Sequence, residues 1–199
     1  MKQYIILLVF IATSINLIAQ NFSGYCNIGI NGSQVSGDNL SGFDKFGVNF
    51  GIGTNRIFHK NIFYNIEIKY IEKGSNNPKL HQNNITEINL SYLELPISVG
   101  IKNNKYAYDV GLSYGYLIKS QEKDKYGEVN NFNQFNNYDV SVFSSFEYKI
   151  KKQIFFDIMI SNTILFWPIR NHSSNTTLWY NQGQYNTVLA LTLKYYIIK

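Results

Sequence analysis

The sequence predicts an all-β protein, an eight-stranded antiparallel up-and-down transmembrane β-barrel. Its connectors alternate between long and short, and a membrane barrel keeps short turns at the periplasmic end and long loops outside. Aromatic residues are abundant, with 16 Tyr and 14 Phe against only 3 Pro, and this composition favours strands. Seven alternating connectors leave eight strands, the smallest common closed size. The short connectors are Arg56–Asn61, Asn103–Lys105 and Ile150–Lys152, and the long ones are Val35–Lys45, Ser75–Glu87, Gln121–Gln134 and Pro168–Gln184.

Residues 1–19 are expected to be a secretory signal peptide. Lys2 precedes an apolar run from Tyr4 to Ala12, and small and polar residues follow up to Ala19, which is the layout of such a segment. The apolar run is shorter than the ~20 residues that a spanning helix needs, so cleavage near Ala19 is favoured over an uncleaved anchor. Residues 20–199 are then expected to form one outer-membrane β-barrel domain.

The first four expected strands each place apolar residues on one face and small, polar or charged residues on the other. Glycines and charges make a poor dry core for a soluble sandwich, whereas apolar residues outward and polar residues inward are what a lipid environment demands. The apolar phases are Cys26, Ile28 and Ile30 in Gly24–Gln34, alternate residues from Phe46 to Ile52 in Phe46–Asn55, from Ile62 to Tyr70 in the third strand, and from Leu93 to Ile101 in the fourth.

The fourth strand contains an irregularity. Ile88, Leu90 and Tyr92 lie in one phase, and the apolar residues from Leu93 onward lie in the other. Pro96 follows at once, and proline cannot donate to the hydrogen-bond ladder. A β-bulge around Tyr92 is therefore expected.

The fifth strand alternates from Tyr106 to Lys119 and begins and ends with tyrosines, which suits an aromatic residue at each membrane interface. The sixth and seventh strands, near Tyr138–Lys149 and Ile154–Phe166, alternate less cleanly. The last strand is expected from Leu189 to Ile197, with Leu189, Leu191 and Leu193 outward.

The inward phases collect charged residues, which are tolerable away from water only when they are paired. Two interpretations remain open, a proton or ion path and a structural network that plugs the bore. The second is favoured, because eight strands leave little open space. The expected members of this lumen network are Glu67, Lys69, Glu94, Lys102, Asp109, Lys119, Asp139, Glu147, Asp157 and Lys194.

The residues that usually carry catalysis or bind metals are scattered. His59, His81 and His172 lie in different connectors, none with a second ligand at metal-binding spacing, and Cys26 is the only cysteine. His172-Ser173-Ser174 contains an H-x-S pair like that of some outer-membrane lipid deacylases, but its Asn- and Ser-rich surroundings indicate a turn. No catalytic residue, metal or other cofactor is expected.

The net charge of +5 does not indicate nucleic-acid binding. The lysines are scattered among strands and loops, without the basic stripe that a nucleic-acid groove requires. A modest attraction to anionic lipid headgroups is compatible with this distribution.

Several segments together resemble a known family. The run Tyr92-Leu93-Glu94-Leu95-Pro96 is similar to a motif of Bacteroidetes outer-membrane barrels of the PorT-like, or porin-family, type. The resemblance implies an eight-stranded outer-membrane barrel, and the founding member is associated with protein secretion. Further segments matching in order are Gly37-Asp38, Ser41-Gly42-Phe43, Phe46 to Ile52, Glu67 to Ser75, Tyr114-Gly115-Tyr116-Leu117 and Asn181 to Asn186.

The function expected from these observations is a non-catalytic outer-membrane barrel with a structural, adhesive or secretion-associated role in its extracellular loops. Its expected partners are outer-membrane lipid and other envelope or secretion proteins. Two alternatives stay open: a lipid-modifying enzyme of the lipid A deacylase type and a soluble periplasmic ligand-binding barrel.

Overall fold

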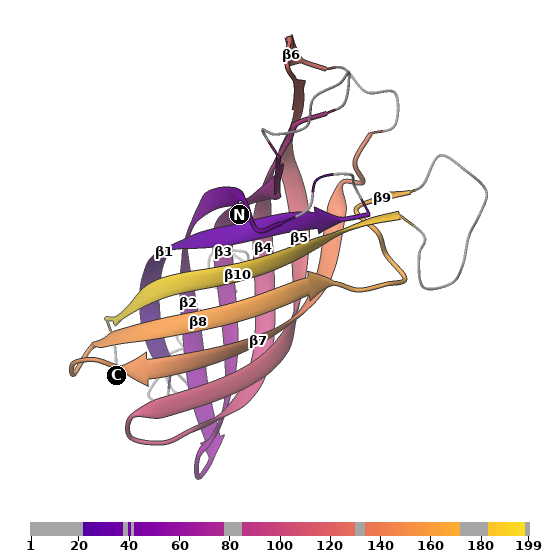
Figure 1. The fold of residues 1–199 in the computed structure, drawn as a ribbon. Helices are drawn as coiled ribbons and strands as arrows, with labels where there is room; N and C mark the ends of the chain where they lie inside the picture. The colour runs from indigo at the N-terminus through magenta and orange to yellow at the C-terminus, as the bar shows by residue number, and fades with distance from the viewer. Residues whose placement is uncertain are drawn as a thin grey trace, which may run out of the picture.

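The computed structural model confirms the expected fold, a closed barrel of eight long antiparallel strands. It describes residues 22–37, 40, 42–77, 85–129, 134–171 and 183–197, so the expected signal peptide, His81 and His172 lie outside the described residues. The first strand pairs with the last, which closes the barrel, and Figure 1 shows these two strands side by side. The strands are β1 (Phe22–Ser36), β2 (Lys45–His59), β3 (Ile62–Asn76), β4 (Glu87–Lys102), β5 (Tyr106–Asp124), β6 (Gly127–Glu128), β7 (Tyr138–Lys149), β8 (Ile154–Thr163), β9 (Arg170–Asn171) and β10 (Gly183–Tyr196).

The strands extend well beyond the membrane at the end that carries the long loops. A tilted strand crosses the hydrocarbon layer in about 9–11 residues, whereas β4 has 16 residues and β5 has 19. The expected connectors Ser75–Glu87 and Gln121–Gln134 are accordingly shorter than the sequence indicated, because β3 and β5 continue into them. The short strand β6 pairs back onto β5, and this hairpin rises above the rest of the barrel (Figure 1).

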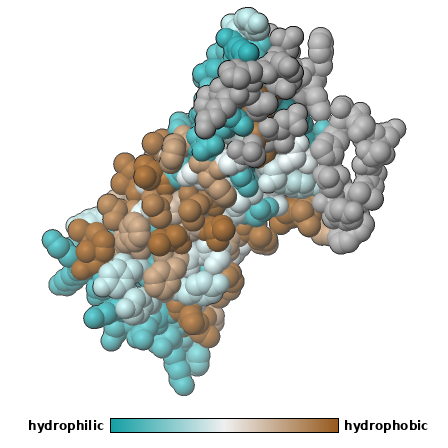
Figure 2. Space-filling view, viewed as in Figure 1, coloured by the Kyte–Doolittle hydropathy of each residue, from teal (hydrophilic) through white to brown (hydrophobic). Residues whose placement is uncertain are grey.

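Apolar side chains cover the outer face of the barrel. Ile28, Ile97, Leu112 and Leu193 are all about half to two-thirds exposed, as expected for side chains that contact lipid. On the face in view, Figure 2 shows a hydrophobic band between two hydrophilic ends. The alternation also holds in β7 and β8, where Phe143 and Met159 point inward and Val142 and Ile158 outward. Within the described residues, no helix is long and apolar enough to cross a membrane.

The bulge lies at the expected level, but the extra residue belongs to a different strand. The register between β4 and β5 shifts at Ser91 and Tyr92, where Tyr92 pairs with Leu117 and Ser91 pairs with Lys119. The unpaired residue is therefore Ile118 of β5. The expectation of a phase change in β4 is wrong, because Leu90, Tyr92 and Glu94 all point inward. The two apolar phases of β4 cover two different surfaces. One faces the interior on the extracellular side of Glu94, and the other faces lipid, mainly on its periplasmic side.

Candidate functional site

The periplasmic half of the bore, which we call the lower lumen, is filled by polar side chains. Lys194 of β10 is central: its Nζ lies 2.8 Å from a carboxylate oxygen of Asp157 and 3.4 Å from one of Glu147. All three residues are buried. Burying these charges is tolerable because the lysine neutralises neighbouring carboxylates.

Two further carboxylates of the lower lumen are held by hydroxyl groups. The Tyr25 hydroxyl donates to Glu67 over 2.7 Å. Asp109 accepts a 2.6 Å hydrogen bond from Ser98 and a second one from Ser145. These residues come from β1, β3, β4, β5 and β7, so the network ties strands across the bore as well as along the sheet.

The opposite half of the bore, the upper lumen, has a different filling. Its apolar plug consists of buried side chains contributed by most of the barrel strands and by three loop segments. Tyr92, Ile71 and Ile169 are almost completely inaccessible to solvent. The members of the plug are Val35, Leu40, Ile71, Ile88, Leu90, Tyr92, Phe135, Phe143, Met159, Ile169, Val188 and Ala190.

One ion triad, Lys73 between Glu94 and Asp139, is enclosed at the base of this plug. The Lys73 ammonium lies 2.5 Å from Glu94 and 2.8 Å from Asp139. Asp139 also accepts hydrogen bonds from Thr163 at 2.8 Å and from Asn186 at 2.9 Å. The Lys73 ammonium also lies over the Tyr92 ring, 5.1 Å from the ring centroid, which adds a cation–π contact.

The structure places most of the predicted network residues inside the bore. Lys102 is half-buried, with its ammonium 5.3 Å from the centroid of the Tyr196 ring. Lys119 requires a correction, because it is exposed on the outer face. The extra residue Ile118 reverses the phase of β5, so Lys119 points outward and Glu122 inward. The predicted residues that are buried are Glu67, Lys69, Glu94, Asp109, Asp139, Glu147, Asp157 and Lys194.

Sequence reasoning missed Lys73, Glu122 and Arg170. Lys73 lies beyond Tyr70, where the third strand was expected to end, so it had no assigned phase. Its spacing of four from Lys69 was the available signal, since even spacing in a strand gives the same face. Glu122 and Arg170 lie in the expected connectors Gln121–Gln134 and Pro168–Gln184, although β5 continues to Asp124.

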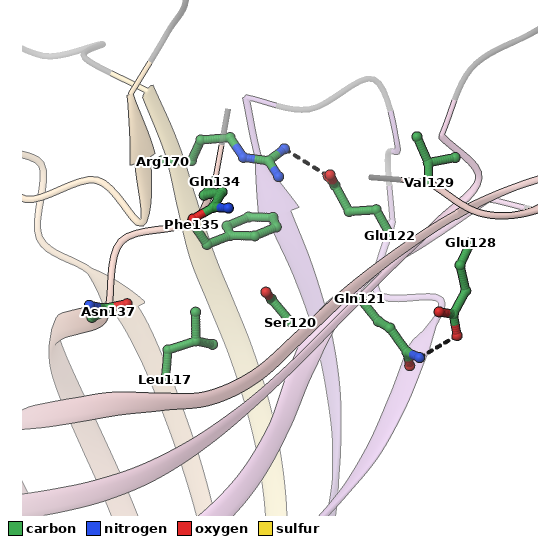
Figure 3. A pocket seen from close by; sticks show the side chains of 10 residues that line it. All are labelled: Leu117, Ser120, Gln121, Glu122, Glu128, Val129, Gln134, Phe135, Asn137 and Arg170. Atoms are coloured by element: carbon green, nitrogen blue, oxygen red, sulfur yellow. Dashed lines mark hydrogen bonds and ion pairs between the residues drawn. The ribbon is translucent and has the colours of Figure 1, made fainter. Parts of the chain in front are cut away.

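The bore and the extracellular end differ in free space. Two cavities in the bore have volumes of only ≈10 and ≈20 Å³, about the room for a single water molecule each. The extracellular end has a cavity of ≈440 Å³ (Figure 3). Its described lining residues are Leu117, Ser120, Gln121, Glu122, Glu128, Val129, Gln134, Phe135, Asn137 and Arg170.

The wall of this extracellular cavity is built around Arg170 of β9. Its guanidinium donates to Glu122 over 2.7 Å and lies 3.6 Å from the centroid of the Phe135 ring. Both charged side chains are more than nine-tenths buried, and Arg170 Nε has no hydrogen-bond partner among the described residues. Loop contacts hold this arrangement, because the backbone N–H of Asn136 donates to the Ile169 carbonyl over 2.7 Å. The cavity therefore has one rigid wall with amide and carboxylate groups around its rim.

Metal binding has no support in the described part of the chain. It contains no group of three His, Cys, Asp or Glu residues placed to hold an ion. His59 is exposed at the end of β2, away from the buried carboxylates.

A family model described as outer membrane protein beta-barrel domain matches residues 18–164. The chain belongs to this family. The crystal structure of Neisserial surface protein A is similar in fold, with a TM-score of 0.51 and 8% identity over 86% of this chain and 96% of that one. Ail of Yersinia pestis, solved with the heparin analogue sucrose octasulfate, has a TM-score of 0.48 and 11% identity over 88% and 98% of the two chains. No curated protein sequence matches the chain. The family match and the closed barrel fold together show that the protein is an outer-membrane β-barrel.

Proposed function

We propose that this protein is a non-catalytic, non-conducting outer-membrane barrel that binds a partner at its extracellular end. The observation that carries the proposal is the contrast in free space, with ≈10 and ≈20 Å³ in the bore against ≈440 Å³ outside the plug. A solute would have to displace both the apolar plug and the Lys73 triad to pass.

The extracellular cavity suits binding better than catalysis. Glu122 is committed to Arg170, and the other described lining groups are amides, a hydroxyl, a carboxylate and apolar side chains. Such a set offers orientation and hydrogen bonds, and it has no nucleophile paired with a base. An adhesive, structural or secretion-associated role is consistent with it.

The finer expectations from the sequence complete this proposal. Cleavage near Ala19 would release residues 20–199 for insertion into the outer membrane. The resemblance to PorT-like barrels of Bacteroidetes favours envelope or secretion proteins as the partners, and lipid surrounds the apolar band.

Planar-bilayer recording and site-specific crosslinking test the proposal together. The purified monomer should give no stable large-conductance steps, and such steps would overturn it. A photo-crosslinker at Gln134, on the cavity rim, should capture an external partner on intact cells. The same crosslinker at Asn104, in a periplasmic turn, should not. Lipid A from cells with and without the protein should be chemically identical, and a change in its acyl chains would assign catalysis instead.

A further inference from the structure

A second hollow, of ≈280 Å³, lies on the outer face of the barrel at the extracellular ends of β3, β4 and β5. Its position follows from the bulge at Ile118, which turns Lys119, Gln121 and Lys123 outward. The outward residues form three rows across the strands. In order toward the loops, the rows are Glu72–Ser91–Lys119, Gly74–Asn89–Gln121 and Asn76–Glu87–Lys123.

Gly74 occupies the β3 position of the middle row, so that row has side chains only on β4 and β5. The position accepts only glycine: φ is +143°, and an added Cβ would lie 1.9 Å from the Ile88 carbonyl oxygen. Such an approach to a backbone atom cannot be relieved by a rotamer change. The backbone path of β3 beside the hollow therefore requires glycine at this position.

Besides the buried Lys73, the hollow is lined by three lysines, Lys45, Lys119 and Lys123, and by two carboxylates, Glu72 and Glu87. Glu87 is shared by two lysines, at 3.1 Å from Lys45 and 3.3 Å from Lys123. Glu72 accepts a 3.1 Å hydrogen bond from the Tyr70 hydroxyl, a neutral donor, and keeps its negative charge. Lys119 is exposed and has no ion-pair partner among the described residues.

The hollow also lies at the level of the lipid headgroups. The next outward row toward the membrane is Tyr70–Leu93–Tyr116, and Tyr is typical of the boundary between hydrocarbon and headgroups. The Tyr70 hydroxyl reaches upward to Ser91 over 3.1 Å. The opposite rim, after β8, exposes Phe166 and Trp167 instead of lysines.

We propose that this hollow binds the phosphate of an anionic lipid headgroup in the outer leaflet. Lys119 supplies an unpaired charge, and Lys123 and Lys45 supply a second contact when they turn from Glu87. The Asn89 amide and the Ser91 hydroxyl line the same hollow and can donate to phosphate oxygens. Lysine is a common phosphate ligand in proteins. The bound lipid would fix one side of the barrel, β3 to β5, against the headgroup layer.

The experiment is a titration of the full, detergent-solubilised barrel with diphosphoryl lipid A, with the bound fraction measured by native mass spectrometry. The double variant K119Q/K123Q should weaken binding about tenfold or more, since each lysine near an anionic surface is worth about 1 kcal/mol. The matched control K105Q/K151Q removes the same charge from exposed periplasmic turns and should change binding less than about twofold. The variant E87Q releases Lys45 and Lys123 and should strengthen binding.

Two results would overturn the proposal. Equal weakening by K119Q/K123Q and by K105Q/K151Q would mean a general charge effect. Equal binding of lipid A and of inorganic phosphate alone would mean a site for a soluble anion. Heat-modifiable gel mobility establishes that each variant is folded, and E87Q keeps the test valid if the double variant does not insert. None of these outcomes depends on whether a protein partner binds the extracellular cavity.

Discussion

The lower and upper lumens of one barrel are filled by different chemistry. In the lower lumen Lys194, Asp109 and Glu67 belong to a polar network in which hydroxyl groups supplement the ion pair. In the upper lumen an apolar plug encloses the triad of Lys73, Glu94 and Asp139. The polar network is bordered mainly by other polar groups, whereas the triad is enclosed by apolar side chains, and its charges are balanced mainly by one another.

The difference indicates where the barrel is most sensitive to substitution. Removing one partner of a buried ion pair costs more than the pair itself contributes, because the remaining charge is left without water or a counterion. A few substitutions in the upper lumen should therefore lower the free energy of unfolding strongly. Many substitutions in the lower lumen should each lower it moderately.

The largest expected effect is that of Lys73→Met. The substitution leaves Glu94 and Asp139 in the plug without their nearest cation, and the free energy of unfolding should fall by about 3–5 kcal/mol. Urea unfolding in phosphatidylcholine vesicles, followed by heat-modifiable gel mobility, measures it. The triple variant K73M/E94Q/D139N should recover most of the loss. Lys69→Met is the matched control, because Lys69 lies 3.8 Å from Glu94; an equal loss there would contradict the special role of the triad.

Leu90→Ala is expected to have the next largest effect. Leu90 is 1% exposed within the plug, so truncation leaves a cavity and should cost about 2–4 kcal/mol. Leu90→Met keeps the volume and should cost less than about 1.5 kcal/mol. The same unfolding assay compares the two. Equal losses would mean that the plug is loosely packed and does not seal the bore.

The two lumens also differ in how far the sequence predicted them. Where a strand alternates between apolar and polar residues, as at Ile97 and Ser98, the contrast predicts which residue contacts lipid. That contrast is present along the lower lumen. In the upper lumen both faces of a strand can be apolar. The sequence pattern therefore suggests that Leu90 and Leu93 share one face with a bulge between them, whereas in the structure Leu90 faces the interior and Leu93 faces outward.

The prediction for Lys119 failed for a related reason. Counting by two assumes a strand without extra residues, and one bulged residue, Ile118, reverses every later position. Glu122 was missed for another reason, because β5 continues into the expected connector Gln121–Gln134. Nothing local to β5 marks Ile118 as the extra residue, because the bulge is defined only by pairing with β4. Contacts between distant segments of the chain, such as Arg170 with Phe135, depend on the closed barrel.

Ser145→Ala tests the lower lumen and should have a moderate effect. It removes one of the two hydroxyl groups that donate to Asp109, and the loss of a hydrogen bond to a charged group should cost about 1.5 kcal/mol. Ser144→Ala is the neighbouring control on the other face and should stay within about 0.5 kcal/mol. Urea midpoints in vesicles distinguish them. A loss of 3 kcal/mol or more, about the size expected for Lys73→Met, would remove the proposed difference between the lumens.

The smallest expected effect is at the extracellular rim. There Glu87 lies between Lys45 and Lys123, a second triad of charges that is partly exposed to water. Partial burial alone would raise the pKa of the Glu87 carboxyl, but the hydrogen bonds and charges of the two lysines outweigh it and lower the pKa. A lowered pKa means that the stabilisation is present above the ordinary value of 4.5 and is lost as the pH falls through the lowered value. An exposed ion pair contributes less than about 1 kcal/mol, so Glu87→Gln should lower the urea midpoint slightly at pH 6. The difference from the unmodified protein should shrink as the pH falls below 4.5 and vanish below the lowered pKa of Glu87. It should also vanish in about 1 M salt, which screens exposed charges. A difference that persisted in high salt would mean that Glu87 behaves like the buried triad, and the contrast between rim and plug would fail.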